Sequence, residues 1–325
     1  MKILNFSEIS KSHFPEGSVV TLGNFDGIHI GHDALIQKLK EVSHDLSIPG
    51  ILVTYYPNPG LVLGKSSGFQ YIYSEDQKLD ILESKGIEYL LKIPFTLEFA
   101  HMPALEFLND ILINKLNAHH IIIGFNHCFG RDREGDYNFL LKNKGISSYE
   151  VSKIDQILLE KNEKISSSYV RSLIQSGQIE RANQILSRNF SIRSKVQTGF
   201  RKGRELGFPT INQEIHPFQI LPADGVYLTK TKIDTTFYPS LTNIGNRPTF
   251  DGVKRSLETH ILNFRADLYD REVEVYYLKR LRDEQKFASV SELVAQLQRD
   301  KTQAESFFLN PALHSGDSLD GDKNE

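Results

Sequence analysis

The spacing of hydrophobic and polar positions divides the chain into two halves. Up to about residue 186, short apolar runs alternate with segments whose apolar residues recur every three or four positions. The runs are typical of buried strands, and the wider spacing is typical of helices that bury one face. Strands that alternate with helices predict a Rossmann-like α/β fold, a parallel sheet covered by helices on both faces.

The first half contains four predicted strands. The sequence places them at residues 19–22, 50–56, 87–93 and 120–124, and it places helices from His32 onward and at 76–85, 104–116 and 177–186. Ligands of such sheets bind beyond the carboxyl ends of the strands. Gly23 and Gly124 each follow a predicted strand, so we expect both to line one crevice.

The second half has a different pattern. Short β-rich runs, separated by Gly, Pro and Asn, occupy residues 191–198, 225–232, 236–243, 257–264 and 272–281. They predict a small antiparallel barrel or sandwich. Helical spacing returns at 289–308, where we expect a helix that closes the barrel.

Length and composition agree with two soluble domains. The chain has 325 residues, 39% of them hydrophobic and 24% charged, and chains of this length usually form more than one domain. We expect an α/β domain at 1–186, a barrel domain at 187–310 and a disordered acidic tail at 311–325.

The charge balance argues against two classes of partner. With 38 basic and 41 acidic residues the net charge is −3, which does not favour binding to nucleic acid or to a membrane surface. A single cysteine, and the lack of a signal peptide or of an apolar run long enough to span a bilayer, make the cytoplasm the expected location. We expect a monomer or a weak homo-oligomer.

A glycine-rich turn joins the first predicted strand to the first predicted helix. Gly23, Gly27 and Gly31 follow the run at 19–22. A helix that begins after such a turn directs backbone N–H groups and its positive dipole end at a ligand above the strand. Phosphate is the common ligand there.

Two histidines lie at the start of this helix. His29 and His32 are three residues apart and can face the same side of the first turn, with Gly31 leaving room for a nucleotide. Imidazoles can donate hydrogen bonds to phosphate oxygens and stabilise the charge that develops as a phosphoanhydride breaks. An isolated H-x-G-H match is weak, but its place after a strand and Gly-Asn-Phe-Asp-Gly favours a nucleotide site.

The loop after the fourth strand is a second candidate region. Asn126 and Phe129 lie in this glycine-bounded loop, which Arg131 and Arg133 follow. Binding residues gather in such loops, although a plain loop with solvated arginines is the alternative. Cys128 has no neighbouring His/Asp arrangement that would indicate a nucleophile.

A row of hydroxyl groups precedes the apolar segment after residue 169. Ser166, Ser167 and Ser168 come before Val170, Leu173 and Ile174. One of them can cap the helix, and with Arg171 they could also bind phosphate.

Three segments of the second half carry candidate chemistry. Glycines and basic residues at 199–207 suit a loop that folds over phosphates. Thr210 and Asn212 offer the hard oxygen ligands that magnesium takes. Asn243 begins a glycine/proline turn, and Glu258 could be the general base for a substrate hydroxyl.

Taken in order, these segments resemble the bacterial bifunctional riboflavin kinase/FAD synthetase family. Residues 23–32 match its G-x-F-D-G-x-H-x-G-H motif, 124–130 its G-x-[DN]-x-x-F-G element, and 165–171 its I-S-S-[ST]-x-[IV]-R element. The kinase elements G-x-P-T-x-N, N-x-G-x-[RP]-P-T and E-x-H follow at 207–212, 243–249 and 258–260.

The resemblance implies an enzyme that phosphorylates riboflavin to FMN with Mg–ATP and then transfers AMP from ATP to FMN, giving FAD and pyrophosphate. It implies catalytic roles for His29, His32 and Glu258. ATP and phosphate contacts are implied for Gly23, Asn24, Phe25, Gly31, Ser166, Ser167, Ser168, Arg171, Gly203, Arg204, Gly207 and Asn243. Flavin contacts are implied for Asn126, Phe129 and Arg247, and Mg²⁺ contacts for Thr210 and Asn212.

One departure from the family lies close to the chemistry. The family commonly has F-[DE]-P-H-P after its second strand, whereas residues 55–59 read Tyr-Tyr-Pro-Asn-Pro. A flavin-binding regulatory protein that has lost one or both activities is therefore an alternative. An aminoacyl-tRNA synthetase fragment would also contain H-x-G-H, but it would leave the barrel motifs unexplained and predicts a basic surface.

Overall fold

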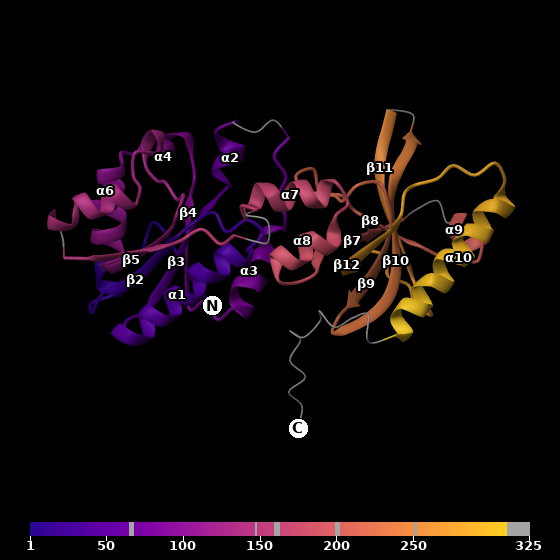
Figure 1. The fold of residues 1–325 in the computed structure, drawn as a ribbon, viewed down its shortest axis with the longest axis horizontal. Helices are drawn as coiled ribbons and strands as arrows, with labels where there is room; N and C mark the ends of the chain where they lie inside the picture. Colours follow the sequence, from indigo (N-terminus) through magenta and orange to yellow (C-terminus); the bar gives the residue numbers. More distant parts are fainter. Residues whose placement is uncertain (65–67, 147, 159–162, 199–201, 250–251, 311–325) are drawn as a thin grey trace, which may run out of the picture. The chain divides into compact units, whose positions relative to one another are not determined.

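The chain forms two compact units (Figure 1). The computed structural model describes residues 1–310 except 65–67, 147, 159–162, 199–201 and 250–251. The α/β unit comprises Met1–Tyr71 and Glu75–Ser167, and the barrel unit comprises Ile72–Ser74 and the residues from Ser168 onward. The tail predicted at 311–325 lies outside the described residues.

A six-stranded parallel sheet forms the centre of the α/β unit, in the order β1-β4-β3-β2-β5-β6. Four strands confirm the predicted ones: β2 (Ser18–Leu22), β3 (Gly50–Tyr56), β4 (Tyr89–Pro94) and β5 (Ala118–Gly124). The edge strands β1 (Lys2–Leu4) and β6 (Glu150–Ile154) were not predicted.

Successive residues of the inner strands contribute to different cores. Val20 and Leu22 belong to one buried cluster, whereas Val19 belongs to another. This alternation follows from the two-residue repeat of a strand and means that both faces of the sheet are covered, as predicted.

Helices connect the strands. The helix expected from His32 is α1 (Ile30–Leu46), which begins two residues earlier, and the helix expected at 104–116 is α5 (Ala104–Glu106) continued by a π-helix, η2 (Phe107–Lys115). The others are α2 (Pro59–Val62), α3 (Glu75–Ser84), α4 (Leu97–Ala100), α6 (Tyr137–Lys142) and the short η1 (Lys11–His13), η3 (Arg131–Arg133) and η4 (Lys144–Ile146).

The barrel unit contains a closed barrel in the order β10-β11-β8-β7-β12-β9. Its strands are β7 (Phe190–Gln197), β8 (Ile211–Gln213), β9 (Gly225–Ile233), β10 (Thr236–Thr249), β11 (Gly252–Ile261) and β12 (Glu272–Arg282). All pairings are antiparallel, as predicted. Strand β8 was not predicted, and β10 is longer than the run that predicted it.

Hydroxyl groups fill much of the barrel interior. Thr229 and Thr242 lie 3.0 Å apart (Oγ1 to Oγ1), Thr242 and Thr259 lie 2.8 Å apart, and all three are fully buried. Leu228 and Leu241, on the opposite face of the same strands, pack in a cluster with the closing helix α10 (Val290–Leu309). Because α10 lies outside the barrel, the threonines point inward and satisfy one another's hydrogen bonds.

Three further helices belong to the barrel unit: α7 (Ser167–Gln175, all but its first residue), α8 (Ile179–Leu186) and α9 (Lys202–Glu205). Contacts therefore group α7 and α8 with the barrel, although the sequence analysis assigned them to the first domain. The domain limit at residue 186 stays a prediction.

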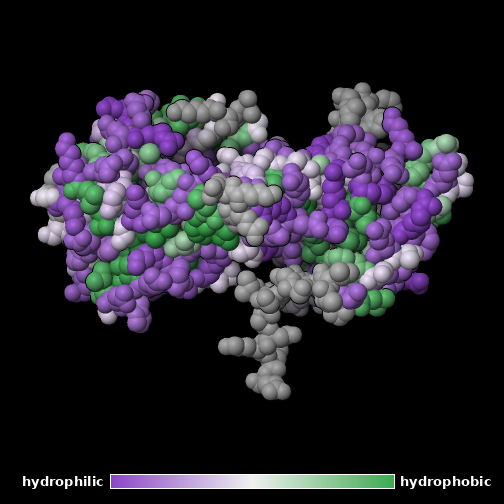
Figure 2. All heavy atoms as spheres, in the orientation of Figure 1, coloured by the Kyte–Doolittle hydropathy of each residue, from purple (hydrophilic) through white to green (hydrophobic). Residues whose placement is uncertain are grey.

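Most of the visible surface of each unit is hydrophilic (Figure 2). Within the described part of the chain, no helix is both long enough and apolar enough to cross a membrane.

A three-residue segment from the first half of the chain packs in the barrel unit. Ile72 and Tyr73 are 0% and 3% exposed, and the Tyr73 ring lies 6.0 Å from that of Phe190. The Gln219 side-chain amide donates to the Ile72 carbonyl at 3.3 Å. We call Ile72–Ser74 the strap.

The strap predicts an effect at a distance in sequence. Tyr73→Ala removes a buried aromatic ring and should destabilise the barrel unit by about 3 kcal/mol. Amide hydrogen exchange should accelerate in β9 and β12 while β2 and β5 stay protected. Phe237→Ala is the control, because this aromatic side chain of β10 is 39% exposed. Equal acceleration of hydrogen exchange in both variants would contradict the role of the strap.

Candidate active sites

The chain leaves β2 through a strained turn. Phe25 and Ile28 have φ angles of +48° and +44°, in the left-handed region that bulky residues rarely adopt. Gly23 donates its N–H to the Val53 carbonyl at 3.1 Å, and a Cβ there would lie 2.9 Å from the Phe25 ring. Such strain persists only where the surroundings hold the backbone, and it is common at functional sites.

Two side chains, those of Lys78 and Thr54, hold the Asn24 carbonyl of the turn in place by hydrogen bonds. The Asn24 carbonyl accepts a hydrogen bond from Lys78 Nζ at 3.0 Å and one from Thr54 Oγ1 at 3.1 Å. Lys78 Nζ also lies 2.9 Å from Thr54 Oγ1. Thr54 is fully buried and Lys78 nearly so.

The two motif histidines stack on each other at the start of α1. The rings of His29 and His32 have centroids 3.9 Å apart and an angle of 16° between their planes. His29 is 7% exposed, and Phe25, fully buried, lies 4.9 Å from His32. A Cβ on Gly31 would lie 3.1 Å from the His29 ring, so the space that the glycine leaves is next to that imidazole.

The serine element begins beside the same turn. Ser167 Oγ donates to the Asp26 carbonyl at 2.5 Å, and α7 starts at Ser167. The structure therefore brings the histidine motif and Ser167 together. Ser166 is half-buried, whereas Ser168 and Arg171 belong to the barrel unit, and the phosphate roles of these three stay predictions.

The loop with Asn126 follows β5, the neighbour of β2 in the sheet. Asn126 is exposed, but the Phe129 ring is 4% exposed and packs 5.2 Å from that of Phe107 in the core. Phe129 thus anchors the loop. Burial, together with the charge of Arg133, lowers the pKa of the neighbouring His127 to about 4, so this imidazole is neutral at physiological pH.

The segment that departs from the family has structural roles. Tyr55 is buried, and Tyr56 is 42% exposed with Lys92 Nζ 5.1 Å from its ring centroid. Asn58, where relatives have histidine, caps α2 by accepting the Gly60 N–H at 2.9 Å. In this chain the segment therefore contributes to the core through Tyr55 and to the start of α2 through Asn58.

Three predicted residues of the barrel lie in one row across three strands. Asn212 of β8 pairs with Glu258 of β11, which pairs with Asn243 of β10. Paired residues share a face of a sheet. The neighbouring Thr242 and Thr259 point inward, so this row lies on the outer face of the barrel.

The Thr210 segment is held against this row. Its predecessor Pro209 accepts a hydrogen bond at 2.7 Å from His260, assigned as the Nδ1–H tautomer, and burial lowers the pKa of that histidine. A Cβ on Gly203 would lie 2.4 Å from the Phe208 carbonyl oxygen and 3.4 Å from Thr210 Oγ1. Only glycine allows α9 to approach the Phe208 carbonyl so closely.

The other predicted residues of this region are less informative. Arg204 is exposed and Gly207 has a φ of +83°. The loop start at 199–201 lies outside the described residues, as does the side chain of Arg247.

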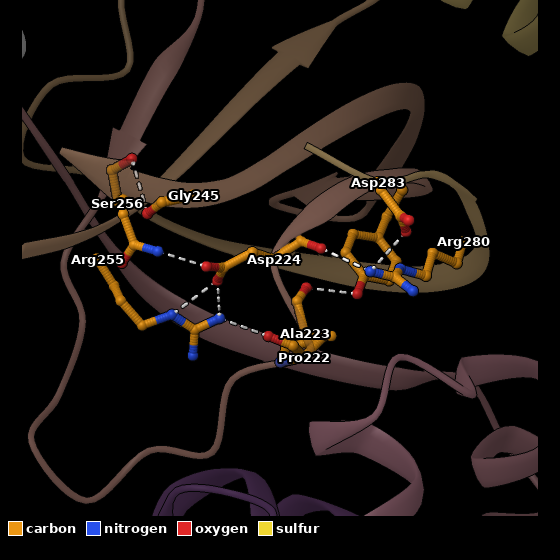
Figure 3. Close-up of polar contacts among 10 residues, drawn as sticks. Pro222, Ala223, Asp224, Gly245, Arg255, Ser256, Arg280 and Asp283 are labelled. Atoms are coloured by element: carbon orange, nitrogen blue, oxygen red, sulfur yellow. Dashed lines mark hydrogen bonds and ion pairs between the residues drawn. The ribbon is translucent and has the colours of Figure 1, made fainter. Parts of the chain in front are cut away.

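An arginine–aspartate network fixes residues 222–224, which directly precede β9 (Figure 3). Arg255 donates to Asp224 Oδ1 through Nε at 3.1 Å and through Nη2 at 2.5 Å, and Nη2 also lies 2.7 Å from the Pro222 carbonyl. Arg280 donates to the Asp224 carbonyl at 2.7 Å, and Asn246 donates to the Asp224 carboxylate at 2.6 Å. Asn246 and Arg255 are cross-strand partners three positions from Asn243 and Glu258, so the network sets the register of the row.

Possible metal ligands are Thr210 and Asn212. Asn212 lies in β8, and Thr210 directly precedes that strand. Their neutral oxygens fit Mg²⁺, which takes few protein ligands and keeps water and substrate phosphates as the others. Among the described residues, no three His, Cys, Asp or Glu side chains gather as a metal site.

Sequence reasoning missed Thr54, Lys78 and Asp224, and it matched His260 only as part of the E-x-H element. A signal existed for Lys78, because it lies four residues before the buried Leu82 and so shares the apolar face of α3. Thr54 and Asp224 are ordinary polar residues within or beside strands, and only the fold shows what they contact.

Comparisons with known proteins match each unit to a separate family model. Residues 11–169 match the FAD synthetase family and residues 186–308 the riboflavin kinase family. The chain is 34% identical over 294 residues to the bifunctional riboflavin kinase/FMN adenylyltransferase of Escherichia coli strain K12, covering 90% of this chain and 93% of that protein.

A Bacillus subtilis protein of the same name is 31% identical over 297 residues, with the same shares of both chains covered. A crystal structure from Streptococcus pneumoniae, described as a macrolide-efflux protein, has a TM-score of 0.84 and 32% identity; it covers 94% of this chain and 98% of that one. With both units matched, the chain belongs to the bifunctional riboflavin kinase/FMN adenylyltransferase family.

Proposed function

We propose that this protein makes FAD from riboflavin in two steps. The barrel unit phosphorylates riboflavin to FMN, and the α/β unit transfers AMP from ATP to FMN. The main support is the row Asn212–Glu258–Asn243, which gathers on one barrel face the polar groups that phosphorylation requires. The relatives are named for both activities, and nothing in the comparisons favours the regulatory alternative.

In the barrel unit, Glu258 acts as general base. Its carboxylate takes the proton of the ribityl 5′-hydroxyl as that oxygen attacks the γ-phosphorus of ATP, and ADP leaves. Asn243, beside Glu258 in the row, and Gly203, Arg204 and Gly207 of the α9 loop bind phosphate. Arg247 contacts the flavin.

Thr210 and Asn212 would hold Mg²⁺ at this site. Held there, Mg²⁺ would supply positive charge that neutralises the phosphate oxygens. The contact of His260 with Pro209 orients this segment beside Glu258.

In the α/β unit, catalysis consists of positioning and electrostatic stabilisation. A phosphate oxygen of FMN, already anionic, attacks the α-phosphorus of ATP, and pyrophosphate leaves. His29, His32 and the start of α1 hold the phosphates, with Gly23, Asn24, Phe25 and Gly31 shaping the turn and Ser166, Ser167, Ser168 and Arg171 contributing further contacts. Asn126 binds the flavin, and Phe129 supports that loop from the core.

We further propose that the enzyme acts in the cytoplasm as a monomer or weak homo-oligomer. Its partners are riboflavin, FMN and ATP, and it binds neither nucleic acid nor a membrane. The net charge of −3 supports this view.

Replacing both motif histidines should separate the two activities. His29→Ala with His32→Ala should lower FAD formation from FMN at least about 100-fold, because phosphate contacts of the transition state are lost. Riboflavin phosphorylation should persist. Chromatographic separation of the flavins over time measures both steps.

His44→Ala is the matched control, since this histidine of α1 has a side chain that is 91% exposed. It should leave both rates unchanged. Loss of both activities in a folded histidine double variant would contradict the two-site proposal.

Glu258→Gln should have the opposite effect. Without the carboxylate, riboflavin phosphorylation should fall about 100-fold or more, while FAD formation from supplied FMN continues. Glu272→Gln, at an exposed position of β12, is the control. If Glu258→Gln still phosphorylates riboflavin at the wild-type rate, Glu258 is not the base.

Chelation tests the metal assignment. Excess EDTA should stop riboflavin phosphorylation, and added Mg²⁺ should restore it. Thr210→Ala should raise the Mg²⁺ concentration needed for half-maximal phosphorylation several-fold, because one ligand is lost. An unchanged Mg²⁺ titration would remove Thr210 from the ligand set.

A further inference from the structure

Lys78 is a buried lysine that contacts the adenylyltransferase motif from below. It is 9% exposed, and its ammonium group donates to the Asn24 carbonyl and to Thr54 Oγ1. Lysine is rarely buried unless its charge serves a purpose, because desolvation of an ammonium group is costly.

The Asn24 carbonyl does not need Lys78 for satisfaction of its hydrogen bonding. Thr54 Oγ1 donates to the same oxygen at 3.1 Å. A neutral residue at position 78 would therefore leave no orphaned carbonyl. What an apolar residue of similar length would lack at this position is therefore mainly the positive charge, since Thr54 would still donate a hydrogen bond to the Asn24 carbonyl.

The contact fixes the direction of one peptide unit. In a trans peptide the N–H of the next residue points away from the carbonyl. Since the Asn24 carbonyl points down to Lys78, the Phe25 N–H points to the opposite side. A cation at the carbonyl end also polarises the peptide and strengthens the positive N–H end.

The backbone around this peptide is otherwise disfavoured. Phe25 has a φ of +48°, so the turn needs contacts that hold it. Two carbonyls of the turn are held, that of Asn24 by Lys78 and Thr54, and that of Asp26 by Ser167. With the carbonyls of Asn24 and Asp26 held by these contacts, the N–H groups of the peptides between and after them are oriented to face an anion.

Charged groups from three elements act on the ammonium group. Asp26 of the turn and Glu75 of α3 favour its protonated form, whereas Lys92 of β4 disfavours it. Glu75 is itself paired with Lys92 at 3.3 Å. Burial is the largest influence and lowers the pKa of Lys78 from its ordinary value.

We propose that Lys78 is a positioning residue for adenylyl transfer, which directs the Asn24–Phe25 peptide N–H toward the phosphates of ATP and adds positive charge beneath them. This inference rests on the proposed FMN adenylyltransferase activity of the α/β unit. Lys78 acts through the turn and does not touch substrate.

The test compares three forms of the full chain with FMN and Mg–ATP. Lys78→Met should lower kcat for FAD formation about tenfold or more, with a change in the KM for FMN of less than about threefold, because a transition-state donor is misaligned. Lys78→Gln can still donate to Asn24 but lacks the charge, so it should recover only part of the rate.

The riboflavin kinase activity of the same molecules is an internal control and should stay within twofold of wild type. Lys40→Met is the matched variant, because Lys40 also donates to a backbone carbonyl, that of Lys85 at 3.3 Å, but at an exposed site. It should leave FAD formation unchanged. Hydrogen exchange in β2 and β3 should be the same in all variants.

A pH profile adds a readout that packing alone would not change. Burial lowers the pKa of Lys78, so the lysine loses its charge at a lower pH than an exposed lysine would. As the pH is raised, wild-type FAD formation should therefore begin to fall before the pH reaches the ordinary lysine pKa of about 10.4. The decline should be absent from Lys78→Met and from riboflavin phosphorylation.

The outcomes are separable. If wild-type protein forms no FAD, the proposed function fails. If wild type forms FAD and Lys78→Met does so within threefold, or Lys78→Gln is fully active, or Lys78→Met loosens β2 and β3, only the role of Lys78 is overturned.

Discussion

The adenylyltransferase half of this protein depends on how its chain leaves β2. The turn adopts backbone angles that bulky residues avoid, at Phe25 and again at Ile28. What holds it is a pair of carbonyl contacts from distant parts of the chain, α3 with β3 on one side and the start of α7 on the other. Because the turn leads directly into α1, it positions the stacked rings of His29 and His32 at the start of that helix.

The kinase half depends on strand register. Asn212, Glu258 and Asn243 share a barrel face only because β8, β11 and β10 pair as they do, and a slip of one strand by one residue would turn its member of the row into the hydroxyl-filled interior. The Asp224–Arg255 contact and the buried threonine chain both oppose such a shift. The hydrogen bonds inside the barrel thus help to fix the strand pairing that places Asn212, Glu258 and Asn243 together on its outer face.

Sequence patterns predicted the parts of the fold with strong periodicity. β3 is a run of seven residues, six of them buried, and its limits were predicted correctly. β1 has three residues and β6 is largely half-exposed, so neither gives an apolar run. Part of the barrel interior was hidden because threonine and serine, polar in any pattern, line it beside apolar residues.

The candidate sites show the same limit. Motifs identified the histidines and Glu258, since their chemistry is carried by residue type and spacing. They could not separate contact with a ligand from support of the backbone. Phe25, within the turn, and Phe129 are core residues, whereas Lys78, which no motif singled out, supports the turn through the Asn24 carbonyl.

The strap has a consequence for how the two activities could be divided between shorter proteins. Residues 72–74 interrupt the sequence of the α/β unit, yet their side chains complete the core of the other unit. A fragment that starts at residue 168 would have every kinase motif and still lack Ile72 and Tyr73, so the Phe190 ring would keep its contact with Tyr277 but lose the one with Tyr73. Division of the chain at this junction would thus remove buried side chains from the core of the barrel unit, and a separate kinase fragment would need a replacement for the strap.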